Sequence, residues 1–436
     1  MSFAHWLLSR EPVIAQQDEF TPVNTANACI LVKLLGAPSH VDTFDLKVGP
    51  WTPRDFNVTQ CGNFQLSGRL FPNLCNVANH LSIARSMRAW GVEHNQAVYA
   101  LMAGRIFNPG FVQEIPHIGS VVSLEYTMRG LTGVFPAFIS FNGTDIESGF
   151  LAARDGSRHN PFITTPSTPE ITHLAGEDRF ERRWELLQAL DSPLRRGSAP
   201  QGDLFNVYDG LYSQARALTH YKPFEQAFTL DSGDSRRYGS TTFGDACLVA
   251  RNILAANQGT RFIAINHAGE NGTTWDNHAN IYGTDTLPSL TREIDAGLAG
   301  LITDMRSMPA SPTQNGRSPS LLDKTLIVVM GEFGRTPGNL NDQGGRDHHP
   351  IFSALFAGGG TRGNVVVGRT DDRGEAIVDS GWRERSRPTR VDDIVATIYS
   401  ALGINWTTVI RDTPSGRAFV YVNYLTEGYP TALPLF

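Results

Sequence analysis

Short apolar runs bounded by turn residues recur along the chain. Each run has a length of about four to eight residues, is rich in Val, Ile, Leu or Phe, and does not alternate with polar residues. Runs of this kind are typical of strands buried on both faces of a parallel or mixed sheet. We therefore expect strands over residues 29–35, 81–87, 135–141, 261–266, 325–330 and 352–357.

Helical patterns lie between several of these runs. Apolar residues recur at helical spacing over 242–256 and 287–308, and a further helix is expected over 391–402. This last segment begins with the acidic pair Asp392 and Asp393 and ends before a glycine, which suits the two ends of a helix. The alternation of strands and helices predicts an α/β sandwich, whose ligand site lies in loops at the carboxyl ends of the strands.

The chain between residues 144 and 239 has a different composition. It mixes Pro, Ser, Gly and Arg and contains two helical patterns, at 177–190 and 203–218. We interpret it as an insertion packed on the main domain, or as a cap over the site. The predicted organisation is therefore an N-terminal extension over 1–28 and a single α/β domain over 29–436 that carries this insertion.

Composition and charge exclude several classes of protein. The 436 residues are 41% hydrophobic and 18% charged, as in globular proteins. No apolar run approaches the roughly 18 residues that a membrane-spanning helix needs, so no membrane span is predicted. The 37 basic and 43 acidic residues give a net charge of -6, which leaves no basic excess to neutralise phosphates. A general nucleic-acid-binding function is therefore not expected.

The cysteines and the N-terminal segment leave two questions open. The four cysteines include no Cys-x-x-Cys pair, which argues against a structural zinc site made of thiolates. Cys61 and Cys75 lie in one loop-rich stretch, where they form a disulfide if the protein is exported or remain free thiols. Residues 1–20 lack the basic and apolar regions of a signal peptide. The protein is then cytoplasmic, or it is periplasmic or exported and its leader has been removed.

Polar clusters follow several of the predicted strands. They lie at 36–45, 93–95, 267–278 and 331–350, and they bring imidazoles and carboxylates to one edge of the proposed sheet. Mixed carboxylate and imidazole ligands suit zinc, manganese or iron, and bridging carboxylates suit a pair of hydrolytic metal ions. We predict one or two divalent ions, zinc or manganese. The candidate metal ligands are Asp42, His94, Asp276, His278, Glu332, Asp347, His348 and His349.

Each candidate also has a simpler interpretation. Asp276 and His278 are spaced so that they could form a hydrogen-bonded pair within one loop, and Asp42 could cap a turn. Glu332 stands at the end of a buried strand, where a carboxylate is costly unless it is paired or metal-bound. Arg335 and Arg346 are candidate clamps for a tetrahedral oxyanion, or they are partners of neighbouring carboxylates.

Four of these segments resemble the signature segments of a known family. They are Gly36-Ala-Pro-Ser-His-Val-Asp-Thr-Phe-Asp45, Trp275-Asp-Asn-His278, Val329-Met-Gly-Glu-Phe-Gly-Arg-Thr-Pro337 and Gly345-Arg-Asp-His-His-Pro350. The order is similar to that of DUF1501, a bacterial family of unknown function placed among the alkaline phosphatase-like, or sulfatase-like, proteins. The resemblance covers about 29–404. It implies a three-layer α/β/α sandwich with a mostly parallel central sheet and metal at the carboxyl ends of the strands.

The resemblance also implies roles for particular positions, and the sequence departs from some of them. Counting back from Gly104, His94 stands where the superfamily has a nucleophilic Ser or Thr, and Phe333 stands where it has a metal-binding histidine. No cysteine lies in a Cys-x-Pro-x-Arg context, so the formylglycine chemistry of sulfatases is excluded. We expect His94 to be a ligand or the nucleophile, with the ligand role favoured.

Two hypotheses from different classes follow. The first is a metal-dependent hydrolase of phosphate or sulfate esters that uses metal-activated water, with His94, Arg335 and Arg346 as candidate catalytic residues and a small-molecule or saccharide ester as substrate. The alternative is a non-catalytic binding or assembly protein that keeps the fold and a structural metal. A serine hydrolase is not expected, because the sequence contains no Gly-x-Ser-x-Gly elbow.

Overall fold

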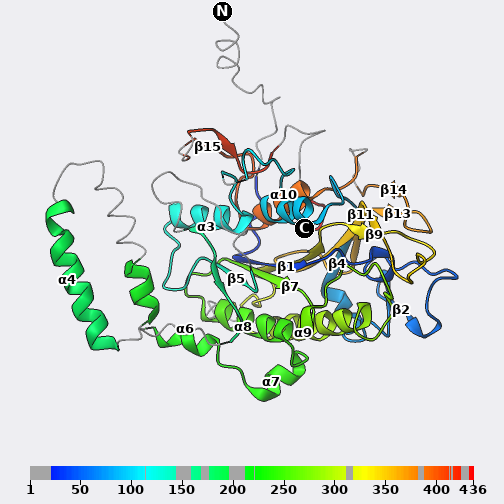
Figure 1. Ribbon diagram of the computed structural model, residues 1–436, viewed down its shortest axis with the longest axis horizontal. Coiled ribbons are helices and arrows are strands. Elements are labelled where there is room, and N and C mark those ends of the chain that lie inside the picture. Colours follow the sequence, from blue (N-terminus) through cyan, green and yellow to red (C-terminus); the bar gives the residue numbers. More distant parts are fainter. Residues whose placement is uncertain are drawn as a thin grey trace, which may run out of the picture.

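The chain folds around one large sheet, shown in Figure 1. The computed structural model describes residues 21–112, 114–143, 159–167, 176–195, 212–219, 221–310, 318–381, 387–411, 413, 416–423 and 432–436. The sheet has eight strands. Their order is β12 (Val365–Val367), β4 (Leu81–Arg88), β11 (Ile351–Gly358), β8 (Thr325–Gly331), β1 (Ala28–Leu34), β7 (Phe262–His267), β5 (Phe138–Phe141) and β6 (Phe162–Thr164).

One strand of this sheet runs against the others. The pairs β1–β7, β1–β8, β5–β7, β5–β6 and β4–β12 are parallel, whereas β11 is antiparallel to both β8 and β4. Because β11 runs in the opposite direction, its first residues lie at the edge where the parallel strands end. Residues that precede β11 therefore join the loops that follow β1, β7 and β8.

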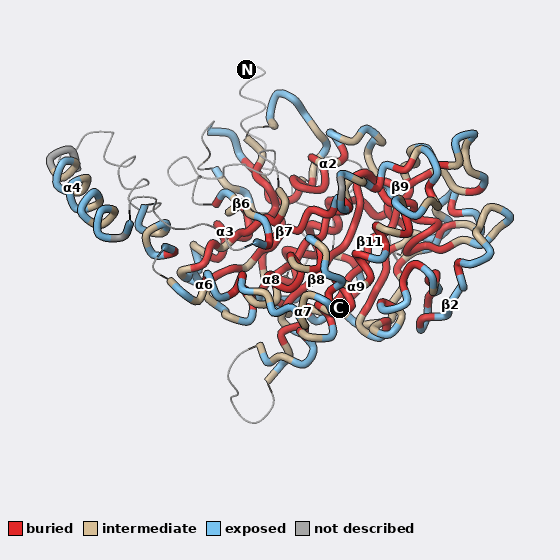
Figure 2. Tube along the Cα trace, turned by 60° about the horizontal axis from the view of Figure 1, so that its bottom comes forward, coloured by how far each residue is buried: buried red, intermediate tan, exposed pale blue. Residues whose placement is uncertain are grey.

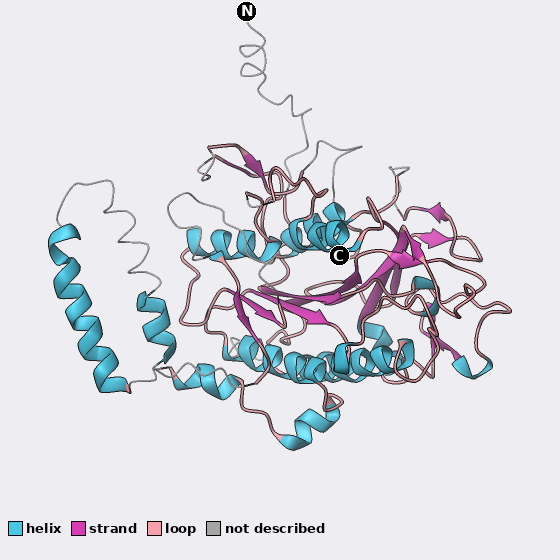
Figure 3. Cartoon of the chain, in the orientation of Figure 1, coloured by secondary structure: helices cyan, strands magenta, loops and turns pink. Residues whose placement is uncertain are grey.

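Helices cover both faces of the sheet and complete a three-layer sandwich (Figures 1 and 3). One apolar core joins the sheet to α8 (Thr242–Ala256) and α9 (Leu287–Ser307) on one face. A second core joins it to α3 (Ile118–Met128) and α10 (Val391–Ala401) on the opposite face. Figure 2 shows that the buried residues gather in the sheet and in these covering helices. The predicted mixed α/β fold, with a mostly parallel central sheet, is thus confirmed.

The remaining elements are shorter or peripheral. Further helices include α2 (His94–Ala103), α4 (Glu177–Arg195), α6 (Lys222–Ala227) and α7 (Ser232–Arg237), with 3-10 turns η1 (His40–Asp42), η2 (Arg54–Phe56), η3 (Leu74–His80) and η6 (Glu270–Gly272). The other strands form two-stranded ribbons, which are β2 (Val58–Cys61) with β3 (Phe64–Ser67), β9 (Gly334–Arg335) with β10 (His348–His349), β13 (Arg369–Thr370) with β14 (Ile377–Asp379), and β15 (Val409–Ile410) with β16 (Phe419–Val420). Among the described residues, no helix is long and apolar enough to cross a membrane.

The apolar runs and helical patterns locate most of the main elements. The strand expected over 135–141 begins only at Phe138, because Pro136 has no backbone N–H to donate to a ladder and its carbonyl instead accepts from the hydroxyl of Thr260. The edge strands β6 and β12 were not predicted, since each is only three residues long. The antiparallel direction of β11 was also not predicted, because an apolar run carries no information about its direction.

The segment at 144–239 is tied to the main sheet as well as projecting from it. β6 belongs to this segment and pairs with β5, so part of the predicted insertion extends the sheet. The helix predicted at 177–190 is α4, and residues 212–219 are helical, whereas 203–211 lie outside the described residues. Figures 1 and 2 place α4 at the opposite end of the molecule from β9 and β11, so this helix does not cover that edge of the sheet.

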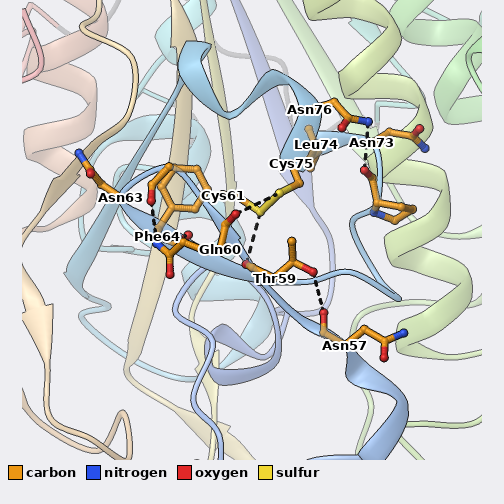
Figure 4. Close-up of a disulfide and its surroundings, with 12 residues drawn as sticks. Asn57, Thr59, Gln60, Cys61, Asn63, Phe64, Asn73, Leu74, Cys75 and Asn76 are labelled. Carbon is orange, nitrogen blue, oxygen red and sulfur yellow. Dashed lines mark hydrogen bonds between the residues drawn. A yellow bond between two sulfur atoms is a disulfide. The ribbon is translucent and has the colours of Figure 1, made fainter.

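A disulfide joins Cys61 at the end of β2 to Cys75 in η3 (Figure 4). Of the two alternatives that the sequence left open, the bonded one is therefore observed. The bond links the β2–β3 ribbon to the 3-10 turn that precedes β4. The other two cysteines, Cys29 and Cys247, are free and buried, and burial raises the pKa of both thiols far above the usual range.

Candidate metal centre

Five polar side chains from four parts of the chain meet at the carboxyl edge of the sheet. Glu332 directly follows β8, Asp276 and His278 lie in the loop after β7, His94 begins α2 beyond β4, and His348 lies in β10 just ahead of β11. The sequence placed polar residues at the ends of strands, and the topology brings these five together because they all emerge at one edge.

Two glycines let the loops approach one another closely. Gly36, just after β1, has φ +102°, and a Cβ there would lie 2.6 Å from the backbone nitrogen of Asp276. Gly345 meets the backbone of His278, where a Cβ would lie 2.1 Å from its carbonyl carbon and oxygen. These contacts bring the loop that carries Asp276 and His278 against the end of β1 on one side and against the approach to β10 on the other.

His94 is oriented by the N-terminus of α2. Glu93 is the N-cap, and its carboxylate accepts hydrogen bonds from the backbone N–H groups of Asn95 and Gln96. The cap fixes the first turn of the helix, so that the His94 ring points to the end of β8. There His94 Nδ1 lies 3.0 Å from Glu332 Oε2.

Three side chains converge as a candidate metal-binding group, namely His94, Asp276 and His348. The Nε2 atoms of His94 and His348 are 3.1 Å apart. Asp276 Oδ1 lies 3.4 Å from His94 Nε2 and 3.6 Å from His348 Nε2. The three side chains are between 25% and 37% exposed, so solvent and a ligand can reach them. We call these three residues the histidine–aspartate cluster.

In His94 and His348, the outer nitrogen Nδ1 faces away from the cluster and the inner nitrogen Nε2 faces into it. The partner of Nδ1 determines where the ring carries its hydrogen. His348 Nδ1 lies 2.7 Å from the carbonyl oxygen of Val92, which can only accept, so Nδ1 carries a hydrogen. His94 Nδ1 donates in the same way to the Glu332 carboxylate, whose other oxygen accepts from the backbone N–H of Gly36 at 2.6 Å. A neutral histidine with a hydrogen on Nδ1 has a lone pair on Nε2.

The Nε2 atoms of the two histidines therefore lie close together, where a hydrogen or a metal ion can join them. Two acceptor nitrogens 3.1 Å apart are unfavourable unless a proton or a metal ion lies between them. Orientation of the outer nitrogen by a carbonyl or carboxylate is also the arrangement that supports metal-binding histidines in proteins. The residues present thus fit a divalent cation held by His94 Nε2, His348 Nε2 and Asp276 Oδ1.

His278 lies beside the cluster in a different role. Its Nδ1 is 3.0 Å from Asp347 Oδ1, and its Nε2 lies 3.0 Å from His348 Nε2. However, His278 Nε2 also accepts a hydrogen bond from Arg335 Nη1 at 3.2 Å. Its lone pair is therefore shared with a guanidinium, and we place His278 and Asp347 next to the ligands rather than among them.

Arg335 supplies a permanent positive charge at the cluster. Its Nη2 lies 2.5 Å from Asp276 Oδ1, and its other N–H groups donate to the carbonyls of Gly36, Ala37 and Arg346 and to His278. All five N–H donors thus have acceptors within the protein, and the side chain is fully buried. Of the two interpretations of Arg335, these contacts favour a partner of neighbouring carboxylates over a clamp for a substrate oxyanion.

The charges at the cluster balance around one divalent ion. Glu332, Asp276 and Asp347 are three carboxylates, and the Arg335 guanidinium compensates only one of them. Two negative charges thus remain uncompensated among the described groups in contact with the cluster. One divalent cation would neutralise both.

The pKa shifts follow from these contacts. The hydrogen bond to Glu332 raises the pKa of His94, whereas burial lowers the pKa of His348. Burial by itself raises the pKa of Asp276, but the hydrogen bond and the charge of Arg335 outweigh it, and the pKa of Asp276 is lowered overall. Asp276 is therefore ionised at neutral pH and available as a ligand.

Asp42 and Arg346 form a separate buried ion pair. Arg346 Nε lies 2.8 Å from Asp42 Oδ2, and the hydroxyls of Tyr282 and Ser39 donate to the two oxygens of the same carboxylate. The other N–H groups of Arg346 donate hydrogen bonds to the Tyr282 hydroxyl, to Asp42 and to the carbonyls of Thr336 and Gly338. We call Asp42 and Arg346, together with the Tyr282 hydroxyl that contacts both, the buried ion pair.

The buried ion pair bears on two of the predicted site residues. Asp42 is a predicted metal ligand, and both of its carboxylate oxygens accept hydrogen bonds from other side chains. Arg346 was expected to clamp an oxyanion, but all five of its N–H groups have internal acceptors. The alternative interpretation, in which the arginine partners a neighbouring carboxylate, is the one observed.

His349 is adjacent to His348 in sequence but lies elsewhere. Its ring stacks on that of His40, with centroids 5.7 Å apart and an interplanar angle of 10°. Successive residues of a strand point to opposite sides, which explains why β10 sends His348 to the cluster and His349 away from it. His349, a predicted metal ligand, is therefore not part of the group formed by His94, Asp276 and His348. Burial lowers the pKa of His40 to about 3, so that ring is neutral at physiological pH.

Phe333 and the nearby hydroxyls also have identifiable roles. The Phe333 ring packs on His94 and His348, with centroids 4.9 and 4.7 Å apart, so it confines the two imidazoles without offering a ligand. Ser39 Oγ donates to Asp42, and Thr43 Oγ1 donates to the carbonyl of Ser39. Both hydroxyls act as local caps, and neither is aimed at the cluster as a nucleophile would be.

Several residues that shape the site were not predicted. The Val92 carbonyl fixes the tautomer of His348, and a backbone atom leaves no mark in the sequence. Tyr282 is far from Asp42 along the chain, and no sequence motif indicates the hydrogen bond between them. The sequence signal for both was their place near a polar cluster, which is too general to assign a role.

Comparisons with known proteins give one family and several distant structures. The family model described as "Protein of unknown function (DUF1501)" matches residues 26–423. No curated protein matches the chain.

Among solved structures, an alkaline phosphatase superfamily protein from Vibrio parahaemolyticus is 11% identical with a TM-score of 0.37, covering 91% of this chain and 70% of that one. The lipoteichoic acid synthase LtaP from Listeria monocytogenes is 9% identical with a TM-score of 0.37, covering 89% and 74%. The phosphonate monoester hydrolase SpPMH from Silicibacter pomeroyi is 12% identical with a TM-score of 0.37, covering 87% and 74%.

Proposed function

We propose that the chain, which belongs to the DUF1501 family, hydrolyses phosphate or sulfate esters with the help of one divalent metal ion. The observation that carries the proposal is the histidine–aspartate cluster, in which the Nε2 atoms of His94 and His348 lie 3.1 Å apart beside Asp276. A divalent ion held there would act as a Lewis acid toward an ester oxygen and toward water.

The residues around the cluster support one ion rather than two. Arg335 lies against Asp276 and His278 and contributes the positive charge that a second ion would otherwise bring. Asp42, another predicted carboxylate ligand, is paired with Arg346 in the buried ion pair. We therefore propose His94, Asp276 and His348 as the ligands, with Glu332 and the Val92 carbonyl as the groups that orient the two rings.

The chain offers no side-chain nucleophile at the cluster among its described residues, so water is the attacking group in this proposal. His94 is held by Glu332 and serves as a ligand. The Phe333 ring excludes water from one side of both imidazoles. The exposed parts of His94, Asp276 and His348 leave the other side open to substrate.

The test compares two adjacent histidines. Full-length protein loaded with zinc or manganese is assayed against phosphomonoesters, phosphodiesters and aryl sulfates. His348→Ala should lower kcat/KM at least about a thousandfold, because it removes a ligand. The matched control is His349→Ala, which removes the neighbouring imidazole outside the cluster and should stay within about threefold of the parent.

A second candidate function retains the histidine–aspartate cluster as a metal site but involves no catalysis. The absence of a hydroxyl aimed at the cluster, together with the packing of Phe333 on its rings, favours a binding or assembly protein with a structural ion. The two functions differ in one outcome. Metal-loaded protein that holds its ion but turns over none of the three ester classes would support the binding protein and reject the hydrolase.

We also propose that the protein works in an oxidising compartment. The supporting observation is the disulfide between Cys61 and Cys75, since such bonds persist mainly in exported proteins. Native protein trapped with an alkylating agent and then unfolded should show two free thiols, those of Cys29 and Cys247. Four free thiols in protein taken from its natural host would contradict this location.

A further inference from the structure

A cavity of about 490 Å³ lies at the end of β4. None of the described residues that line it is acidic. Its wall includes Arg88, Trp90, Val92, Pro350, Arg387 and Arg390. A concave surface with three guanidinium groups, one indole and no carboxylate has the composition of a site for an oxyanion attached to a ring.

The cavity adjoins the histidine–aspartate cluster through shared residues. Val92 lines the cavity, and its carbonyl accepts the hydrogen bond from His348 Nδ1. Pro350 lies two residues beyond His348, and its carbonyl accepts from the backbone N–H of Ala89, another lining residue. The same short segments thus form one wall of the cavity and support the cluster.

The arginines of the cavity differ in how far they are already paired. Arg387 makes two hydrogen bonds of 2.7 Å to the buried Asp393, and Arg390 lies 3.7 Å from the buried Asp392. Arg88 is exposed, and no described carboxylate forms an ion pair with it. Arg387 and Arg390 thus lie against carboxylates, whereas Arg88 is exposed and has no ion-pair partner among the described carboxylates.

The backbone holds these arginines in place. The backbone N–H of Arg88 donates to the carbonyl of Thr389 at 2.8 Å, and the N–H of Thr389 donates to the carbonyl of Ser86 at 2.9 Å. The segment that carries Arg387 and Arg390 is therefore attached to the end of β4, next to Arg88. A bound anion would meet a preformed wall and would not need to order it.

Resting on the proposed function, we infer that this cavity binds a second oxyanion group of the substrate, so that the substrate is a multiply charged ester of a sugar. Arg335 and Arg346 have no donor left for an anion, so the positive charge that recognises substrate comes from Arg88 and its neighbours. The Trp90 ring offers a flat apolar face for the sugar, and its buried Nε1 has no hydrogen-bond partner among the described residues.

The experiment measures binding without turnover. Full-length, metal-free protein is titrated by calorimetry with a multiply sulfated heparin disaccharide and with its desulfated counterpart. The sulfated probe should bind at least about tenfold more tightly, and Arg88→Gln should weaken its binding about five- to tenfold. The matched control is Arg369→Gln, an exposed arginine on β13 outside the cavity, which should change the affinity less than about twofold.

The outcomes separate this inference from the proposed function. Equal binding of the two probes, or equal effects of Arg88→Gln and Arg369→Gln, would overturn it. Because the titration uses metal-free protein, a hydrolase that fails its own test leaves the binding result intact. In a protein that does turn over, Arg88→Gln should raise KM for a disulfated sugar much more than it changes kcat.

Discussion

The histidine–aspartate cluster and the buried ion pair lie at the same edge of the sheet, and each has an aspartate that contacts an arginine, Asp276 with Arg335 and Asp42 with Arg346. In the buried ion pair, Asp42 and Arg346 use every oxygen and every N–H on internal partners. In the cluster, the outer nitrogens of His94 and His348 have hydrogen-bond partners, and their inner Nε2 atoms lie 3.1 Å apart.

The difference shows how a structural polar group can be told from a ligand-binding one. A buried polar network with all donors and acceptors matched is complete and stabilises the fold. In the cluster, the Nδ1 atoms of His94 and His348 have partners, whereas their Nε2 atoms face each other. This network is complete only when a cation, either a proton or a metal ion, lies between the Nε2 atoms. The same residue types therefore have different roles, and the hydrogen-bond partners decide which.

The largest expected effect is on the buried ion pair. Asp42→Ala leaves the Arg346 guanidinium buried without its carboxylate, which should lower the free energy of unfolding by about 3–5 kcal/mol. His348→Ala, measured in the presence of a chelator, should lower it by less than about 1 kcal/mol, since the half-buried ring has no matched inner partner. Urea unfolding followed by circular dichroism gives both values. Equal losses in the free energy of unfolding for the two variants would contradict the distinction between the buried ion pair and the cluster.

The buried carboxylate of Asp392 is intermediate between the buried ion pair and the histidine–aspartate cluster. Asp392 lies 3.7 Å from Arg390 Nε, and burial together with the charge of Asp393 raises the pKa of Asp392 to about 7. Since the folded-state pKa is above the unfolded value of 3.8, the folded state holds this proton more tightly. The stability contributed is present in full below about pH 4 and is lost as the pH rises through 7.

Asp392→Asn should therefore remove this part of the pH dependence. Between pH 5 and pH 8 the free energy of unfolding of the parent should fall by about 2–4 kcal/mol more than that of the variant. Urea unfolding at four pH values measures the difference. Parallel pH profiles for parent and variant would show that Asp392 is ionised in the folded protein throughout.

A metal ion should stabilise the parent but not a ligand variant. At a free zinc concentration a hundredfold above its dissociation constant, the ion should add about 2.7 kcal/mol to the free energy of unfolding. His348→Ala should lose this increment, whereas Asp42→Asn should retain it even though it is less stable overall. Thermal unfolding with and without zinc makes the measurement. A zinc-dependent gain in His348→Ala would place the ion elsewhere.

Much of the fold could be predicted from the sequence because it depends on local patterns. The continuous apolar runs of β1, β7, β8 and β11 reflect burial on both faces, and α9 shows the apolar periodicity of a covering helix. The direction of β11 could not be predicted, because strand direction depends on how the chain returns to the sheet. That direction brings His348 to the site.

The candidate site was predicted as a set of residues but not as an arrangement. Polar residues at the ends of strands indicated the right edge of the sheet, and His94, Asp276 and His348 were among them. Whether an arginine or aspartate is saturated depends on partners far away in the chain, such as Tyr282 for Asp42. Spacing along the sequence contains no information about such pairing, so Asp42 and Arg346 could not be separated from the cluster.

The central claim is that one divalent ion completes the histidine–aspartate cluster. Protein equilibrated with excess zinc, freed of unbound metal by gel filtration and measured by elemental analysis tests it directly. The account predicts one equivalent in the parent and in His349→Ala, and close to none in His348→Ala. No bound metal in the folded parent would contradict the account, and two equivalents would contradict the role given to Arg335.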